Sequence, residues 1–135
     1  MKETINLKIL TPEKELYSGE VVEIKSENEF GSFGILPNHV AMITVLRPAI
    51  TVFKEVSGKV LKIFTSTGIL KVEGNIISIM CQAAEWPEEI DLTRAEESKK
   101  RSELKLAGKG NLDNDEIRAE LSLTRALTRI KIKRN

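Results

Sequence analysis

The sequence contains few of the residues from which metal, redox and catalytic sites are usually built. Its 135 residues include one cysteine and one histidine, which excludes an intramolecular disulfide and argues against a zinc site made from those side chains. Cys81 follows the apolar run Ile76-Ile77-Ser78-Ile79-Met80, so we expect a buried, unreactive thiol. His39 has no second histidine or cysteine nucleophile to work with. General-base chemistry at His39 is therefore an alternative only, and no catalytic residue is nominated.

Aromatic residues, excess charge and long apolar runs are also scarce. Aromatics make up 4% of the chain and the net charge is +1, which leaves neither stacking platforms for RNA nor a whole-molecule attraction to anions. The basic end of the chain, from Arg129 to Arg134, keeps RNA as an alternative, although an acidic protein surface fits it better. No run approaches the roughly 18–20 apolar residues of a membrane helix, and residues 1–4 lack the apolar stretch of a signal peptide. We expect a protein of a reducing compartment.

Up to Trp86 the chain has the pattern of a small β domain. Ile5, Leu7 and Ile9 alternate with polar residues, which is the period of a half-buried strand. A return strand is expected at 15–17, a break at Ser18-Gly19, and further strands at 21–24, 41–46, 50–56, 60–65, 69–72 and 75–82. Turn signals at 57–58 and 73–75 separate some of them. Many short strands without intervening helices predict an all-β sandwich or flattened barrel.

After Trp86-Pro87 the apolar period becomes helical. Asp91 is a candidate N-cap, Gly108 and Gly110 are expected to end a first helix, and residues 111–115 offer caps for a second. Each helix has only a thin apolar stripe, so the hairpin should pack marginally on the β unit or on a partner. The predicted fold class is α+β by segments, with an N-terminal all-β sandwich or flattened barrel at 1–86 and a C-terminal antiparallel two-helix hairpin at 87–135.

Arginines recur at helical spacing in both predicted helices. Arg94 and Arg101 are seven residues apart in the first, and Arg118, Arg125 and Arg129 project within a narrow arc of the second. If the helices are antiparallel, guanidinium groups from both can converge, and they repel one another unless carboxylates or phosphates lie between them. Two interpretations stay open. One is a solvated, salt-bridged helix face, and the other is a site for an anion such as a nucleotide phosphate.

The segment Phe30-Gly31-Ser32-Phe33-Gly34-Ile35-Leu36-Pro37-Asn38-His39 is the second notable motif. It lacks the G-x-x-x-x-G-K-[ST] pattern of a phosphate loop and is not followed by a helix signal. Its glycines and the Pro-Asn pair indicate tight turns and close backbone approach. A loop placed by a rigid sheet is more typical of a contact surface than of catalysis.

Several motifs, taken in order, resemble the epsilon subunit of the bacterial F-type rotary ATP synthase. They are Ser18-Gly19 before Val21-Val22, Gly34-Ile35-Leu36-Pro37-Asn38-His39, Thr67-Gly68-Ile69-Leu70-Lys71-Val72 before Asn75, Ala83-Ala84-Glu85, Ile90-Asp91-Leu92-Thr93-Arg94-Ala95, Arg118-Ala119-Glu120-Leu121 and Arg125-Ala126. The resemblance covers nearly the whole chain, and it depends on the order of the motifs and on the matching length. The chain departs from it at Ser32, where the family often has Glu, and at Thr67-Gly68, where Gly-Gly is usual.

The resemblance implies a non-catalytic subunit of the central stalk rather than an enzyme. The β-sandwich would bind the gamma subunit and sit on the c-ring. The hairpin would either fold on the sandwich or extend along gamma towards acidic parts of the catalytic beta subunits, and so oppose ATP hydrolysis. The location implied is peripheral, at the cytoplasmic face of the cell membrane, reached only through the complex. No nucleic acid partner and no required cofactor are implied. A free-standing nucleotide-sensing module is the alternative.

The resemblance also nominates two sets of site residues. In some bacterial members the I/L-D-x-x-R-A motif helps to bind a regulatory ATP, which favours the folded hairpin. Carried to this chain, the ATP-binding set is Ile90, Asp91, Arg94, Ala95, Arg101, Arg125 and Arg129. The set assigned to contacts with the c-ring or gamma is Gly31, Ser32, Gly34, Pro37, Asn38 and His39.

Overall fold

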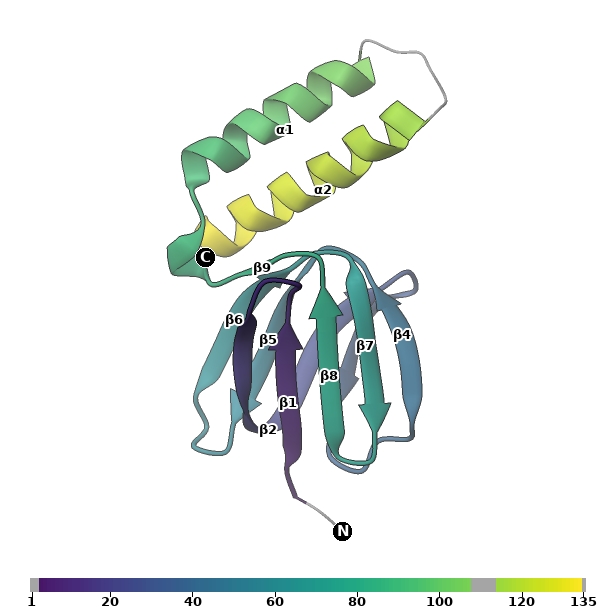
Figure 1. The fold of residues 1–135 in the computed structure, drawn as a ribbon. Coiled ribbons are helices and arrows are strands. Elements are labelled where there is room, and N and C mark those ends of the chain that lie inside the picture. Colours follow the sequence, from purple (N-terminus) through teal and green to yellow (C-terminus); the bar gives the residue numbers. More distant parts are fainter. Residues whose placement is uncertain (1–2, 108–113, 135) are drawn as a thin grey trace. The chain divides into compact units, whose positions relative to one another are not determined.

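The computed structural model describes residues 3–107 and 114–134 (Figure 1). The chain forms two compact units, Met1–Trp86 and Pro87–Asn135. The strands that the structure describes all belong to the first unit, and the two α-helices belong to the second. Within the described ranges, neither helix combines the length and the apolar character that crossing a lipid bilayer requires.

The first unit is a β-sandwich, which confirms the predicted fold of this part. Its strands are β1 (Ile5–Leu10), β2 (Glu15–Asn28), β3 (Gly31–Ile35), β4 (Met42–Leu46), β5 (Ala49–Glu55), β6 (Val60–Thr65), β7 (Gly68–Glu73), β8 (Ile76–Cys81) and β9 (Ala84–Glu85). They are hydrogen-bonded in the order β1-β8-β7-β4-β2-β5-β6-β9, while β3 pairs with β2 and β1 also pairs with β2. In Figure 1, β1, β8, β7 and β4 form one layer, and β2, β5 and β6 lie behind it. The long β2 therefore connects the two layers.

Two of the predicted strand limits are wrong. The break expected at Ser18-Gly19 does not occur, because β2 continues through both residues and pairs them with Lys8 and Leu7 of β1. A Cβ at Gly19 would lie 2.8 Å from the Tyr17 hydroxyl oxygen, so the glycine serves close packing here rather than a turn. The turns expected at 31–35 are instead strand β3.

The core of the β unit is aliphatic and well filled. Burial alternates along several strands, such as β1 and β5, whereas β6 buries three consecutive residues. The fully buried side chains include Leu7, Ile9, Ile24, Ile35, Leu46, Phe53, Ile63, Leu70, Ile77 and Ile79. Cys81 is also buried, which confirms the predicted burial of this thiol. Such a core resists local rearrangement, because each buried side chain is held by many neighbours. The β unit is therefore a rigid support for the loops and strand faces that it exposes.

The second unit begins with a short 3-10 helix, η1 (Pro87–Glu89), and continues with α1 (Leu92–Ala107) and α2 (Asn114–Arg134). The two helices lie side by side and run in opposite directions, as the sequence predicts (Figure 1). The Arg94 N–H donates a hydrogen bond of 3.1 Å to Asp91 Oδ1, which confirms Asp91 as the N-cap of α1. The stops predicted at Gly108 and Gly110 and the caps predicted at 111–113 lie outside the described residues.

Most of the buried side chains of the two helices are small, and Ile132 of α2 is the one large apolar side chain among the buried ones that the structure describes. Ala95 and Ser102 of α1 are buried, as are Ala119 and Ala126 of α2. Each pair is separated by seven residues, about two helical turns, so each pair lies on one face of its helix. Small residues allow two helices to approach closely, but each buries little apolar area. The hairpin thus has a close contact with little hydrophobic stabilisation.

Candidate functional site

Four of the residues nominated for ATP binding lie together at the start of α1. Asp91 and Arg94 are exposed, whereas Ile90 and Ala95 are each 5% exposed. The Ile90 N–H donates to the Pro87 carbonyl oxygen at 3.3 Å, and the Ala95 N–H donates to the Asp91 carbonyl oxygen at 3.0 Å. Ile90 and Ala95 therefore shape the start of the helix by packing. The side chains of Asp91 and Arg94 are the ones presented to solvent.

The remaining nominated arginines lie on the same flank of the hairpin as Arg94. Arg94 and Glu96 stand on opposite sides of the buried Ala95, because successive helical residues are rotated by about 100°. On α2, Arg125 directly precedes the buried Ala126, and nine residues, about 180°, separate it from Arg134. The bond between Arg134 and Glu96 places these two residues on one flank of the hairpin. Arg94 and Arg125 lie on the opposite side of their helices and therefore share the other flank. This second flank, with Arg94, Arg101, Arg118, Arg125 and Arg129, is called the arginine flank below.

The arginines of this flank are spread along the hairpin rather than gathered at one point. The contact between Glu96 and Arg134 sets the register of the antiparallel helices. Arg101 is five residues after Glu96, and Arg129 is five residues before Arg134, so both lie about 7.5 Å along the axis from that contact. Arg101 and Arg129 are therefore level with each other. By the same helical geometry, Arg94 and Arg125 lie on either side of this pair along the flank.

Burial and hydrogen bonding differ among these arginines. Arg94 and Arg101 are exposed, while Arg125 and Arg129 are partly buried. The Arg125 guanidinium donates a hydrogen bond of 3.1 Å to Ser122 Oγ, one turn earlier on α2. The α2 side of the flank is thus the more ordered side. The α1 side offers guanidiniums that can reorient towards a ligand.

The opposite flank carries charges of both signs and joins the two ends of the hairpin. A cavity of about 240 Å³ lies there, lined by Glu96, Lys99, Lys100, Glu103, Ile130 and Arg134. Beside it, Lys133 Nζ donates to the Pro87 carbonyl oxygen at 2.9 Å. The last residues of α2 are thereby bonded to the segment that opens the second unit. None of the nominated ATP residues lines this cavity.

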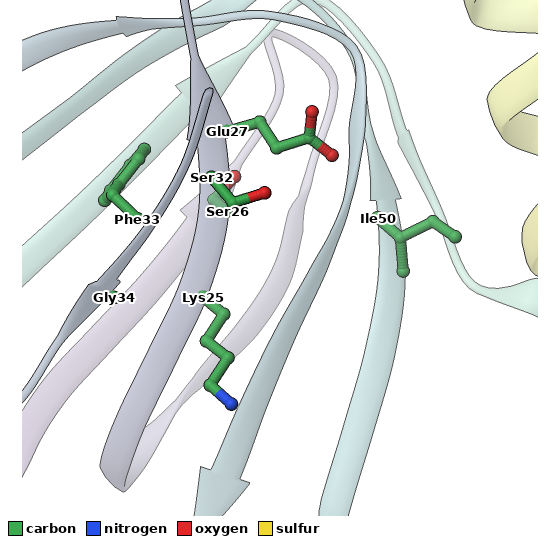
Figure 2. Close-up of a pocket in the computed structure, with 7 residues that line it drawn as sticks. All are labelled: Lys25, Ser26, Glu27, Ser32, Phe33, Gly34 and Ile50. Carbon is green, nitrogen blue, oxygen red and sulfur yellow. The ribbon is translucent and has the colours of Figure 1, made fainter. Parts of the chain in front are cut away.

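The residues nominated for partner contact lie partly in β3 and partly in the loop that follows it. Gly31, with φ of 114°, directly follows the turn at residues 29–30. Ser32 and Gly34 are exposed along the strand. Ser32 and Gly34 line a cavity of about 330 Å³ together with Lys25, Ser26, Glu27, Phe33 and Ile50 (Figure 2). In Figure 2 the side chains of Lys25, Glu27 and Ile50 extend to the same side of the strands. The absence of a carboxylate at Ser32 leaves Glu27, its cross-strand partner, as the acidic group there.

Pro37, Asn38 and His39 lie beyond the other end of β3, in the β3–β4 loop (residues 36–41). Gly31 and Pro37 are separated by the length of β3, whereas Gly34 and Pro37 are only three residues apart. Leu36 and Val40 are 59% and 74% exposed. His39 Nδ1 lies 2.8 Å from the Val40 carbonyl oxygen, so this ring nitrogen is used within the loop. The nominated set therefore runs along β3 and continues into the β3–β4 loop.

The sandwich also carries an apolar row that contains none of the residues nominated from the sequence. Val45 pairs with Ile69, Ile69 with Met80, and Met80 with Leu10, across β4, β7, β8 and β1. Val45, Ile69 and Met80 are 63%, 43% and 45% exposed. These four residues line a cavity of about 630 Å³ with Thr11, Pro12, Thr67, Gly68, Cys81 and Gln82. The sequence pattern that could have predicted this row is the run of consecutive apolar residues in β7 and in β8, because such runs leave both faces of a strand apolar.

Aromatic packing holds the last residue of the β unit in place. The rings of Tyr17, Phe53 and Trp86 are in mutual contact, with centroids 4.5–6.5 Å apart. The Tyr17 hydroxyl donates to Glu55 Oε2 at 2.7 Å. Burial, reinforced by the Glu55 carboxylate, raises the pKa of Tyr17 to about 12. Because Trp86 is anchored in this cluster, the change from one unit to the other falls directly after it.

Comparison with known proteins gives both halves of the chain a family. Residues 4–87 match the model "ATP synthase, Delta/Epsilon chain, beta-sandwich domain", and residues 88–134 match "ATP synthase, Delta/Epsilon chain, long alpha-helix domain". The chain is 49% identical over 132 residues to the ATP synthase epsilon chain of Clostridium kluyveri, and 50% identical over 133 residues to that of Clostridium botulinum strain Langeland. In both cases 98% of each chain is covered.

Solved structures show the same fold at lower identity. A chain of the Euglena gracilis mitochondrial ATP synthase superposes with a TM-score of 0.83 at 20% identity, covering 95% of this chain and 80% of that one. A chain of the Tetrahymena thermophila mitochondrial ATP synthase gives 0.63 at 18% identity, with 98% of each chain covered. The family models and the close bacterial relatives, which span the full length, confirm the resemblance drawn from the motifs. The chain belongs to the ATP synthase delta/epsilon family, as an epsilon chain of the bacterial F-type.

Proposed function

We propose that this chain couples the c-ring to the gamma subunit through its β-sandwich and restrains ATP hydrolysis through its helical hairpin. An ATP synthase epsilon chain is a non-catalytic subunit, so its activity consists of contacts. The complex would hold the chain peripherally at the cytoplasmic face of the cell membrane. The gamma subunit, the c-ring and the catalytic beta subunits are the proposed partners.

The observation that carries this proposal is the chemical contrast between the exposed surfaces of the two units. The sandwich carries an apolar row of Leu10, Val45, Ile69 and Met80 that lines a cavity of about 630 Å³, and the last three of these side chains are exposed. An exposed apolar patch on a small domain supports a protein interface. The hairpin exposes a cationic flank instead. Cations arranged along a helix suit an acidic protein surface, because such contacts steer association without requiring a large apolar area.

Truncation in the assembled complex tests the two halves of the proposal separately. Removal of residues 87–135 is expected to raise ATP hydrolysis while the shortened chain is retained in the purified complex. Unchanged hydrolysis would contradict the restraint. Loss of the shortened chain from the complex would contradict docking through the sandwich. Reconstitution with the full chain is the control, and it should return hydrolysis to its starting rate.

A nucleotide-binding role for the hairpin is the second candidate, and the arginine flank favours it. By helical geometry Arg101 and Arg129 lie at the same level on adjacent helices, where both guanidinium groups can reach one polyanion. Arg94 and Arg125 extend the row in both directions, as a chain of phosphates requires. The proposed ligand is a regulatory ATP that bridges α1 and α2 and so favours the folded hairpin.

Calorimetry on the full chain in isolation tests this candidate. ATP should bind, and Arg101→Ala or Arg129→Ala should weaken binding about tenfold or more, because each removes a charge-assisted contact. Lys100→Ala is the matched control, since it removes the same charge from α1 on the opposite flank and should leave affinity unchanged. No heat at millimolar ATP, or an equal loss in the control, would contradict an arginine-flank site.

A further inference from the structure

Asn75 connects three separate segments of the β unit. It lies in the two-residue turn between β7 and β8, next to Gly74. Its side-chain Oδ1 accepts a hydrogen bond of 2.7 Å from the Asn38 N–H, and its Nδ2 donates to Asn38 Oδ1 at 3.2 Å. Its carbonyl oxygen accepts a bond of 2.8 Å from the Asn6 N–H of β1. One turn residue therefore bonds both the N-terminal strand and the β3–β4 loop.

The orientation of the Asn75 amide follows from its partner. The Asn38 main-chain N–H is an obligatory donor, so the side-chain atom of Asn75 that faces it must be the oxygen. The amide nitrogen is then directed at Asn38 Oδ1, which accepts. The pairing is therefore reciprocal, with one bond to the main chain of Asn38 and one to its side chain.

Asn38 adopts a backbone conformation that needs such support. Its φ is 67°, in the left-handed region that non-glycine residues adopt only at a cost, although asparagine adopts it more readily than most. Strained conformations persist where the surrounding structure holds them. The two bonds from Asn75 supply that support across 37 residues of sequence. The path of the chain through Leu36, His39 and Val40 depends on this fixed point.

We propose that Asn75 is a positioning residue that holds the β3–β4 loop ready for contact with a rotor subunit. The loop presents the exposed side chains of Leu36 and Val40 on either side of Asn38 and His39. Apolar side chains carried on a held loop form a contact without ordering the loop on binding, which would cost affinity. Asn75 itself need not touch the partner. The inference rests on the proposed function, because it assigns the loop to that docking.

The experiment compares variants of Asn75 in the full chain. Asn75→Ala removes both bonds. Asn75→Asp keeps an acceptor for the Asn38 N–H, and the Asn38 amide can rotate to donate to the second oxygen. Two measurements are made on each variant, the amide exchange of residue 38 by NMR in the free chain, and the affinity for an F-type complex stripped of its own epsilon subunit.

Asn75→Ala is expected to accelerate exchange at residue 38 and to weaken association, each by about tenfold, since two hydrogen bonds are lost. Asn75→Asp is expected to stay within about threefold of the unaltered chain in both. Because Asn75→Ala also removes side-chain contacts in the turn, exchange at Leu70 in the β core is recorded as a measure of global stability. Unchanged exchange at residue 38, or equal acceleration at residues 38 and 70, would overturn the positioning role.

Variants of the loop itself separate this inference from the proposed function. Leu36→Ser and Val40→Ser change exposed side chains and leave Asn75 intact. If they weaken association and Asn75→Ala does not, the loop is a contact but Asn75 does not position it. If they leave association unchanged, the loop is not a contact, and the proposed docking through it is wrong. The inference is supported when both the loop variants and Asn75→Ala weaken association and Asn75→Asp does not.

Discussion

The β unit and the helical hairpin bury different kinds of side chain. The β unit packs isoleucine, leucine and phenylalanine side chains that are fully removed from solvent, among them Ile24, Phe53 and Leu70. In the two helices the buried residues are mostly small, such as Ala95 and Ala126, and Ile132 is the larger exception. The burial of an alanine contributes a fraction of what the burial of a leucine contributes. The two regions therefore differ in how much free energy is needed to open them.

This difference suits the two proposed roles. A surface that docks on a partner is most effective when it is already held in its binding geometry. A part that restrains hydrolysis in one conformation and releases it in another needs states that differ by only a few kcal/mol. Elements that move are drawn from the least stable parts of a protein.

Leu70→Ala should give the largest effect, because it deletes a fully buried side chain from the β core. The free energy of unfolding should fall by about 2–5 kcal/mol. Denaturant unfolding followed by Trp86 fluorescence measures it. Leu104→Ala, at a side chain of α1 that is 72% exposed, is the matched control and should change stability little. Similar losses in the two variants would remove the contrast between the regions.

Gly68→Ala should destabilise the β unit by about 1–3 kcal/mol through overpacking. A Cβ at this position would lie 2.3 Å from the Met80 carbonyl oxygen and 2.6 Å from Cys81 Cα, both main-chain atoms of β8. Gly34→Ala is the matched control, since a Cβ there would find its nearest neighbour at 3.8 Å. Thermal unfolding compares the two. A tolerated alanine at residue 68 would show that β7 and β8 can separate, contrary to a rigid β unit.

Asp91→Ala should cost about 0.5–2 kcal/mol, because the Arg94 N–H loses its capping acceptor. Although smaller than the core losses, this cost falls on the weaker region and should fray the start of α1. Hydrogen exchange of the α1 amides measures it. Asp91→Ser should restore protection, since serine also caps helices. Equal protection in all three chains would mean that the cap contributes nothing to the stability of the hairpin.

The stability of the β unit should fall as the pH rises from about 9 to about 12. Burial raises the pKa of the Cys81 thiol from 9.0 to about 11, and burial together with Glu55 raises that of Tyr17 from 10.0 to about 12. Between these values the folded chain binds more protons than the unfolded chain, so the free energy of unfolding decreases with pH. The stabilisation is complete below about pH 9. Tyr17→Phe with Cys81→Ala should flatten this part of the profile, and an unchanged slope would contradict the assignment.

The smallest change in stability should come from Lys133→Ala with Arg134→Ala. These residues bond Pro87 and Glu96 at the open end of the hairpin, and exposed ion pairs contribute about 0–1 kcal/mol. The effect should appear as faster amide exchange near the end of α2, and it should diminish at high salt. Lys131→Ala is the control, since it also removes a cation from the exposed face of α2. Salt-independent exchange in the unaltered chain would argue against an ionic contribution.

The sequence was most informative where local residue patterns alone determine the structure of an element. Alternation predicts β1, short apolar runs with turn signals between some of them predict β4–β8, and the two-residue turn at Gly74-Asn75 follows from its composition. Asp91 was recognised as a cap for the same local reason. The strand β3 was missed because Gly31 and Gly34 are also typical of turns. Only its pairing with β2 makes it a strand.

Features that need a register between distant segments could not be read in advance. The apolar row forms because β1, β4, β7 and β8 align four residues from separate parts of the chain. Helical spacing placed the arginines on one side of each helix. It did not show that Arg101 and Arg129 are level, since that depends on how α1 and α2 slide past each other. The bonds between Asn75 and Asn38 likewise depend on the way the sandwich closes.

Native-state hydrogen exchange of the full chain, resolved amide by amide, tests the contrast between the two regions most directly. We predict that amides in α1 and α2 exchange through an opening that costs less free energy than global unfolding, whereas those of Leu70 and Ile79 exchange only when the whole β unit unfolds. Equal opening free energies in the two regions would contradict the account. The hairpin would then be a fixed part of one cooperative unit and could not act as a separately moving restraint.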